Sequence, residues 1–90
     1  MSILIDTPVW KFRGVKHAHM ISDVSYDELH IFAASLGFPL RAFQGDHYDL
    51  PEYLVPVALG MGATQVDPRE LARRLRGAGL RRPRGTRPER

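Results

Sequence analysis

The sequence predicts a small layered α/β domain, with a mainly parallel sheet of three or four strands and about three helices. Two observations lead to this prediction. Short apolar runs suited to strands alternate along the chain with segments whose apolar residues recur at helical spacing. Two of these segments begin with capping boxes, which mark helix N-termini. Because strands that alternate with helices are usually joined by right-handed crossovers, we expect most neighbouring strands to be parallel.

The first strand is expected at residues 2–5, a short apolar run that stops at Asp6 before Thr7 and Pro8. Residues 9–16 contain Trp10, Phe12 and Gly14 among basic residues. They fit either an irregular loop packed by its aromatic side chains or a short hairpin arm.

A second strand is expected at residues 17–22, where residues 17, 19 and 21 would share a face by the two-residue period of strands. The first helix follows it. Ser25 and Glu28 have the spacing of a capping box, and Gly37 is suited to the left-handed position that ends a helix.

A third strand is expected at residues 40–44, with residues 45–49 as the loop that leaves it. Pro51 can begin a second helix. Pro56 lies inside that helical pattern, where its ring removes a backbone donor and crowds the preceding turn. The second helix is therefore expected to be kinked or shortened.

The last elements are a fourth strand at residues 62–66 and a helix capped by Asp67 and ended by Gly79. We expect one domain over residues 1–80. Residues 81–90 are rich in Arg and lack a hydrophobic period, so they are expected to be a disordered tail.

Composition excludes several classes of protein. The 90 residues include no Cys, which excludes disulfides, thiolate nucleophiles and zinc–thiolate sites. The longest apolar stretch, residues 53–63, is far shorter than the ~20 residues that cross a bilayer. The N-terminus resembles no export signal. We therefore expect no membrane association and a cytoplasmic location.

Charge is divided unevenly along the chain. Residues 69–90 contain nine Arg and two Glu, a net charge of +7, whereas residues 1–68 contain four basic and eight acidic residues, a net charge of −4. A basic end on an acidic body fits a nucleic-acid-associated or regulatory module without chemistry, and equally a solubilising tail or an acidic protein partner. The candidate phosphate contacts are Arg69, Arg73, Arg76, Arg81, Arg82 and Arg84.

At least one acidic residue lies just after the C-terminal end of each predicted strand. If the strands are parallel, these carboxylates meet at one edge of the sheet, where α/β domains bind ligands. Imidazole and carboxylate groups bind divalent cations such as Mg²⁺ or Mn²⁺ and transfer protons. The sequence thus favours a metal-assisted enzyme that acts on a phosphate ester, a nucleotide or another phosphorylated small molecule. The candidate metal ligands are Asp6, Asp23, His47 and Asp49, and the candidate catalytic residues are His19, as ligand or proton carrier, and His47.

Structural roles compete with this interpretation. Asp6 and Asp23 each fit a turn cap, and His19 in an apolar strand fits a core imidazole as well as a ligand. Asp67 is better explained as an N-cap than as a ligand. A third class of function, a protein-binding adaptor, would use Trp10 and its aromatic and basic neighbours as an anchor.

The chain also resembles a small family found in bacteria and their phages, domain of unknown function 4031, over about residues 2–80. No activity follows from this resemblance, but it implies that His19, Asp23, His47 and Asp49 form a family pattern. Pro56 departs from the more regular helix of the relatives. The matching segments are Ile-Leu-Ile-Asp6, His19-Met-Ile-Ser-Asp23, Glu28-Leu29, Leu36-Gly37, His47-Tyr48-Asp49, Gly62-Ala63 and Arg69-Glu70-Leu71.

Overall fold

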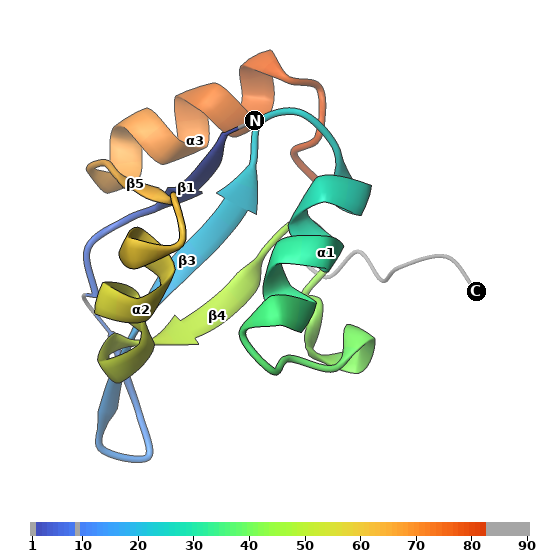
Figure 1. Cartoon of the computed structure of the whole chain (residues 1–90). Helices are drawn as coiled ribbons and strands as arrows, with labels where there is room; N and C mark the ends of the chain where they lie inside the picture. The colour runs from blue at the N-terminus through green and yellow to red at the C-terminus, as the bar shows by residue number, and fades with distance from the viewer. Residues whose placement is uncertain (1, 9, 83–90) are drawn as a thin grey trace.

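The computed structural model describes residues 2–8 and 10–82, which form a compact α/β domain (Figure 1). Within these residues, five strands build one mixed sheet and three α-helices pack against it. The elements in chain order are β1 (Ile3–Ile5), β2 (Trp10–Phe12), β3 (Val15–Ser22), α1 (Tyr26–Ser35), the 3-10 helix η1 (Leu40–Ala42), β4 (Tyr48–Pro51), the 3-10 helix η2 (Glu52–Leu54), α2 (Val55–Gly60), β5 (Thr64–Gln65) and α3 (Pro68–Gly77).

The eight-residue strand β3 is the centre of the sheet. Along one edge it pairs with β2 through residues 15–17 and with β1 through residues 20–22. Along the other edge it pairs with β4 through residues 17–20. All three pairings are antiparallel, and β5 alone pairs in parallel, with β1. The prediction of a mainly parallel sheet is therefore wrong.

The antiparallel pairing along one edge of β3 has a local cause in the connection between β2 and β3. Arg13 and Gly14, at φ 54° and 81°, form the two-residue turn of a β-hairpin. Turns with positive φ at both central residues match the twist of paired strands, which is why they join tight hairpins. The hairpin alternative for residues 9–16 is thus correct within the described residues, and no helix separates these two strands.

The third strand was predicted in the wrong place. Residues 40–44 contain η1 instead of a strand, and Leu40 is 66 % exposed. The strand β4 begins at Tyr48, inside the segment expected to be a loop. Tyr48 and Leu50 are buried while Asp49 between them is half-buried, so β4 has the two-residue alternation of a strand with one face in the core.

The helix starts agree with the capping chemistry. The Ser25 side chain accepts a hydrogen bond from the Glu28 backbone N–H at 3.0 Å, and Asp67 does the same for Glu70 at 2.9 Å. The Glu28 carboxylate, however, accepts from the Ser22 hydroxyl, so the reciprocal half of the first capping box is absent. As expected from Pro56, the second helical segment is short and is preceded by η2. No helix in the described part of the chain combines the length and apolar character needed to cross a membrane.

The two faces of the sheet are covered differently. On one face, side chains of β1, β3 and β4 pack with those of α1 and α2 in the main core. On the other face, Leu4 and Ile21 pack with Leu71 and Leu75 of α3. This second cluster covers only the end of the sheet where β3 finishes, so the face carrying His19 stays partly open.

Candidate functional site

The helix α3 covers one face of the sheet only at the end where β3 finishes. The candidate site lies on the uncovered part of this same face. His19 lies on this face together with Ile21, because side chains two positions apart on a strand point the same way. In the register of β3 and β4, His19 pairs with Asp49, so these two side chains are neighbours across the strands. Asp6 follows β1 and reaches the same place from the opposite edge of β3.

Asp6 is a buried carboxylate, 1 % exposed, that fixes the orientation of His19. Its Oδ1 accepts from the His19 backbone N–H at 2.7 Å, and its Oδ2 accepts from the ring Nδ1 at 2.8 Å. Both oxygens are thus engaged with one residue, so Asp6 orients His19 and does not cap a local turn. The His19 side chain is 39 % exposed, which excludes the core-imidazole alternative, and its Nε2 atom is left for a ligand.

A second buried carboxylate orients His47 in the same way. The Oδ1 atom of Asp46 lies 2.7 Å from His47 Nδ1, and Asp49 Oδ1 lies 3.2 Å from His47 Nε2. The other oxygen of Asp46 accepts from the Arg82 backbone N–H at 2.9 Å. Asp46 follows a predicted strand, but sequence reasoning did not include it among the site residues. Its position directly before His47 was the available signal.

The two aspartates change the pKa of His47. Burial alone lowers this pKa, but the hydrogen bonds to Asp46 and Asp49 and their negative charges outweigh burial and raise it to about 9. Burial likewise raises the pKa of Asp46, while hydrogen bonds from His47 and the Arg82 backbone, together with the charges of His47 and Arg81, lower it below its usual value. Without a metal ion, His47 is therefore a cation held between two carboxylates at neutral pH.

His19, His47 and Asp49 form a possible metal-ligand group. One ligand atom from each lies within 4.8 Å of the others. The two imidazole rings are 5.0 Å apart between centroids, edge to face, and the Trp10 ring lies 4.5 Å from that of His19. All three side chains are partly exposed, so an ion could reach them from solvent.

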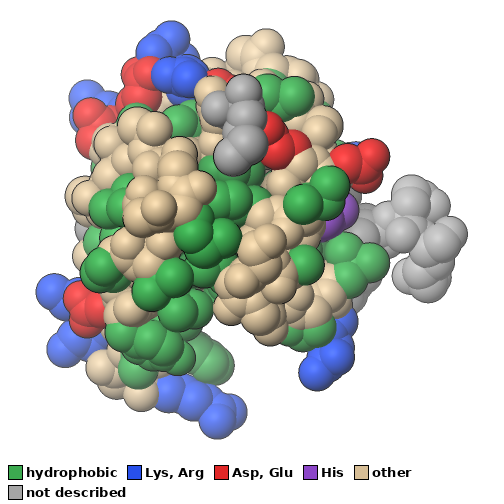
Figure 2. Space-filling model, in the orientation of Figure 1, with side chains coloured by type: hydrophobic (Ala, Val, Ile, Leu, Met, Phe, Trp, Pro, Cys, Tyr) green, Lys and Arg blue, Asp and Glu red, His purple; other side chains and the backbone are tan. Residues whose placement is uncertain are grey.

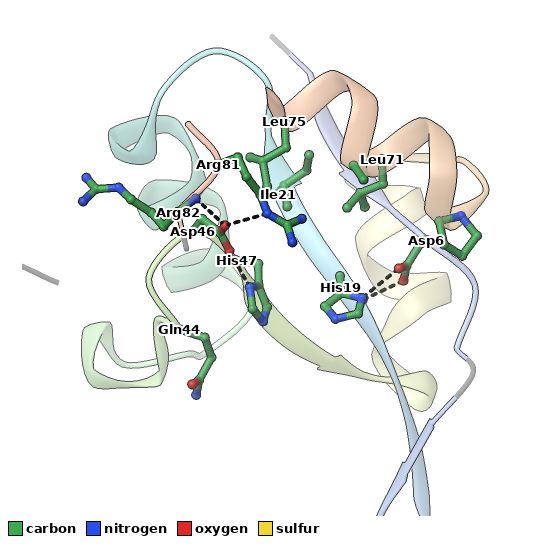
Figure 3. Close-up of a pocket in the computed structure, with 12 residues that line it drawn as sticks. Asp6, His19, Ile21, Gln44, Asp46, His47, Leu71, Leu75, Arg81 and Arg82 are labelled. Carbon is green, nitrogen blue, oxygen red and sulfur yellow. Dashed lines mark hydrogen bonds and ion pairs between the residues drawn. The ribbon is translucent and has the colours of Figure 1, made fainter. Parts of the chain in front are cut away.

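A pocket of about 480 Å³ opens beside these residues (Figure 3). One side is polar, and the other is the apolar surface of α3 and Ile21. Figure 3 shows the Arg81 side chain directed into the pocket and the Arg82 side chain directed away from it. Arg82 instead donates to the Tyr26 hydroxyl at 2.8 Å. The lining residues are Asp6, His19, Ile21, Gln44, Asp46, His47, Pro68, Leu71, Ala72, Leu75, Arg81 and Arg82.

Asp23, a predicted metal ligand, does not join the group. Its Oδ2 atom accepts from Arg74 Nε at 3.1 Å and Nη2 at 2.8 Å, an ion pair that links the end of β3 to α3. The antiparallel pairing of β1 and β3 explains why Asp23 lies apart from the group. Asp6 and Asp23 both follow strands, but because β1 and β3 run in opposite directions, Asp6 lies beside His19 whereas the Asp23 backbone donates to Ser2.

The arginines predicted to contact phosphate differ in their surroundings within the described part of the chain. Arg69, Arg73 and Arg76 are all exposed on α3, and Arg73 is also paired with Glu70 of the same helix. Arg81 enters the pocket and Arg82 binds Tyr26. Arg84 and the rest of the expected tail beyond residue 82 lie outside the described residues.

Comparison with known families gives a match over nearly the whole domain. The family described as "Protein of unknown function (DUF4031)" matches residues 3–78. The chain belongs to this family. The DUF4031 match includes Asp6, His19, Asp46, His47 and Asp49, so the whole His/Asp cluster lies inside the family's region. Comparisons with curated proteins and with solved structures found no match.

Proposed function

We propose that the chain binds a divalent transition-metal ion through His19, His47 and Asp49 and uses it in the hydrolysis of phosphate esters. One observation supports the metal site above all others. Both imidazoles of the group have Nδ1 hydrogen-bonded to a buried aspartate, Asp6 or Asp46.

This paired arrangement is typical of metal-binding histidines. A histidine that ligates a metal usually donates its other ring N–H to a carboxylate or carbonyl, which fixes the tautomer and makes the free nitrogen a better ligand. Here two histidines share this feature, and the carboxylate of Asp49 is adjacent. Two imidazoles and one carboxylate leave open coordination positions for water and substrate.

The donor set indicates which ions fit. Imidazole nitrogen suits Zn²⁺, Fe²⁺ and Ni²⁺, and Mn²⁺ accepts mixed nitrogen and oxygen ligands, whereas Mg²⁺ prefers oxygen ligands almost exclusively. Of the two ions expected from the sequence, Mn²⁺ therefore fits this group better than Mg²⁺. The absence of Cys leaves nitrogen and oxygen ligands as the only strong donors for Zn²⁺.

The pocket favours a phosphorylated substrate. Arg81 is half-exposed, and its Nε lies 4.0 Å from Asp46, so its guanidinium can bind a phosphate oxygen inside the pocket. The apolar surface of α3 can pack against the organic part of the ester. A bound divalent ion would polarise a phosphoryl oxygen and lower the pKa of water. The protein's own contribution is to orient both imidazoles and to place Arg81 in the same pocket.

The metal site is tested by thermal unfolding of chelator-treated protein with added Mn²⁺, Zn²⁺ or Mg²⁺. An ion at a hundredfold excess over its Kd adds about 2.7 kcal/mol to the free energy of unfolding. We expect Mn²⁺ and Zn²⁺ to stabilise the protein and Mg²⁺ to have little effect. His47→Ala should remove the stabilisation, and His17→Ala, on the same strand but outside the group, should retain it. If no ion stabilises the protein, the proposal is wrong.

The reaction is tested separately with p-nitrophenyl phosphate and its diester analogue in the presence of Mn²⁺. We expect turnover that disappears in His47→Ala. Arg81→Gln should raise KM for the substrate without weakening Mn²⁺ binding, because Arg81 is not a metal ligand. Metal binding without turnover of either ester would support the site and contradict the phosphoesterase activity.

A further inference from the structure

The β2–β3 hairpin extends beyond the rest of the domain. β4 pairs with β3 only as far as His17, so residues 10–16 form a two-stranded arm, and within residues 2–8 and 10–82 no third strand lies beside it. In Figure 1 the arm points away from all three helices. Phe12, near its tip, is 60 % exposed. An isolated hairpin is only marginally stable by itself, and this one leaves a large aromatic side chain in water.

The aromatic side chains of the arm share one face. Trp10 is paired with His17 and Phe12 with Val15, so these four side chains lie on the face that leads to His19. The ring of His17 lies 5.8 Å from that of Trp10 and 6.2 Å from that of Phe12. Because Trp10 also contacts His19, the aromatic surface is continuous with the proposed metal ligands.

The charge of the arm is entirely positive. No acidic residue occurs between Thr7 and Ser22. Lys11 and Lys16 are exposed and lie directly opposite each other in the register, and the Arg13 guanidinium lies 5.3 Å from the Phe12 ring centroid. In Figure 2, Lys and Arg side chains surround the end of the molecule where the arm lies. Like charges that face each other across strands are destabilising, and an anionic partner would relieve this repulsion.

We propose that this arm, residues 10–17, binds single-stranded nucleic acid. Unpaired bases would stack on Trp10 and Phe12, and Arg13, which lies against Phe12, would contact a phosphate beside them. Lys11 and Lys16 lie on the other face of the arm, and their long side chains would reach further phosphates around its edges. Alternation of aromatic stacking surfaces with basic side chains is the usual chemistry of single-strand binding, because every base has a flat face and every nucleotide a negative charge. A duplex fits less well, since its bases are already stacked on each other. Binding of the nucleic acid to the arm does not depend on the metal. The further idea that the bound strand continues toward His19 and His47 rests on the proposed function.

Trp10 makes the test direct because it is the only tryptophan in the chain. The full chain is titrated with a fifteen-nucleotide oligothymidine in the presence of EDTA, and tryptophan fluorescence is recorded. We expect saturable quenching as bases stack on the indole. The affinity should fall with salt concentration with a logarithmic slope near −2, because three cations release about 0.7 counterion each on a single strand.

Variants then assign the binding to the arm. Stacking of one base contributes about 1–3 kcal/mol, so Phe12→Ala should weaken the affinity at least fivefold. Lys11→Gln combined with Lys16→Gln should weaken it further and reduce the salt slope. Tyr53→Ala, which removes an aromatic side chain 68 % exposed elsewhere, and Arg41→Gln are the matched controls and should bind as the parent does. Circular dichroism of each variant checks that the fold is retained.

Three results would overturn the proposal. The first is no quenching, or quenching that Phe12→Ala leaves unchanged. The second is equal affinity for a duplex of the same length, since this would indicate a general attraction of charges. The third is a dimer that Phe12→Ala dissociates and that excludes the oligonucleotide, which would make the arm a protein interface. The His47→Ala variant separates the two proposals, because it should abolish the thermal stabilisation by Mn²⁺ and leave oligonucleotide binding intact.

Discussion

The face of the sheet that carries His19 has two ends that differ in what covers them. At one end, Leu4 and Ile21 are buried under Leu71 and Leu75 of α3. At the other end, the same strands present Asp6 and His19 to a pocket and to solvent. Ile21 and His19 are only two positions apart on β3, so the difference comes from what packs above them and not from the strand itself.

The comparison distinguishes residues that mainly stabilise this small domain from residues that could bind a ligand. The closed end excludes water over apolar side chains, which is the main source of folding free energy. The open end keeps one carboxylate, Asp6, almost fully buried, and it stays favourable there because the backbone and the ring of His19 both donate to it. Changes at the closed end should therefore alter mainly stability, and changes at the open end should alter mainly ligand binding.

Truncating the closed end should have the largest effect. Leu75 is 2 % exposed, and Leu75→Ala should lower the free energy of unfolding by about 2–5 kcal/mol, because a cavity is left in a small core. Urea unfolding measures this loss. Leu40→Ala, at an exposed leucine outside both clusters, is the control and should change stability by less than about 0.5 kcal/mol. A small effect at Leu75 would show that α3 does not close this end firmly.

At the open end, the free energy of unfolding of the metal-free protein should depend on pH. The folded pKa of His47 is about 9 and its unfolded pKa about 6.5, so its stabilising contribution is complete below pH 6.5 and is lost as pH rises through 9. In EDTA, we expect the free energy of unfolding to fall by on the order of 2–3 kcal/mol across this range. His47→Gln should remove this fall. The same pH profile in parent and variant would contradict the assignment.

A change in the buried carboxylate should weaken metal binding while leaving all three ligands in place. Asp6→Asn retains an oxygen for the His19 backbone N–H but replaces the charged partner of Nδ1. Loss of such a supporting hydrogen bond typically costs ten- to a hundredfold in metal affinity, and we expect this for Mn²⁺ measured by calorimetry. Unchanged affinity would show that Asp6 serves only the fold.

Substitution of Asp23 should have the smallest effect on stability and metal affinity, in contrast to substitution of Asp6. It ends a strand as Asp6 does, but it is paired with Arg74. Asp23→Asn should leave Mn²⁺ affinity unchanged within about twofold. It should reduce the free energy of unfolding by about 1 kcal/mol or less, as for other partly exposed ion pairs. A large loss of metal affinity in Asp23→Asn would place the metal elsewhere than between His19 and His47.

Local chemistry explains which parts of the fold could be predicted. The starts of α1 and α3 depend on Ser25 and Asp67 and on residues within one helical turn of them, so the sequence alone locates them. The small size of the domain and the strand at residues 17–22 follow from length and alternation. Strand direction depends on pairing between distant residues, and no local pattern states it. Element order alone therefore predicts a parallel sheet wrongly. The hairpin at Arg13 and Gly14 makes β2 and β3 antiparallel, and β4 pairs antiparallel with β3 although α1 lies between them.

The candidate site was predictable in part for the same reason. His19, His47 and Asp49 are uncommon residue types in short clusters, and the sequence marks them. Which of them meet depends on register: His19 lies opposite Asp49 because β3 and β4 pair as they do. Asp23 was expected beside the other carboxylates because of the assumed strand direction, and in the antiparallel sheet it lies with Arg74 instead. The position of Arg81 also required the structure, since only the packing of the segment after α3 brings it to the pocket.

The hydrogen bond from the His19 amide to Asp6 gives the protein a built-in spectroscopic reporter. This amide lies in the middle of β3, yet it donates to a side-chain carboxylate instead of a strand carbonyl. A diamagnetic ion such as Zn²⁺ on the His19 ring would draw charge from it, polarise the same carboxylate and shift the resonance of this proton. A single backbone signal in a nitrogen-15 spectrum would thus follow occupancy without labelling the ligand.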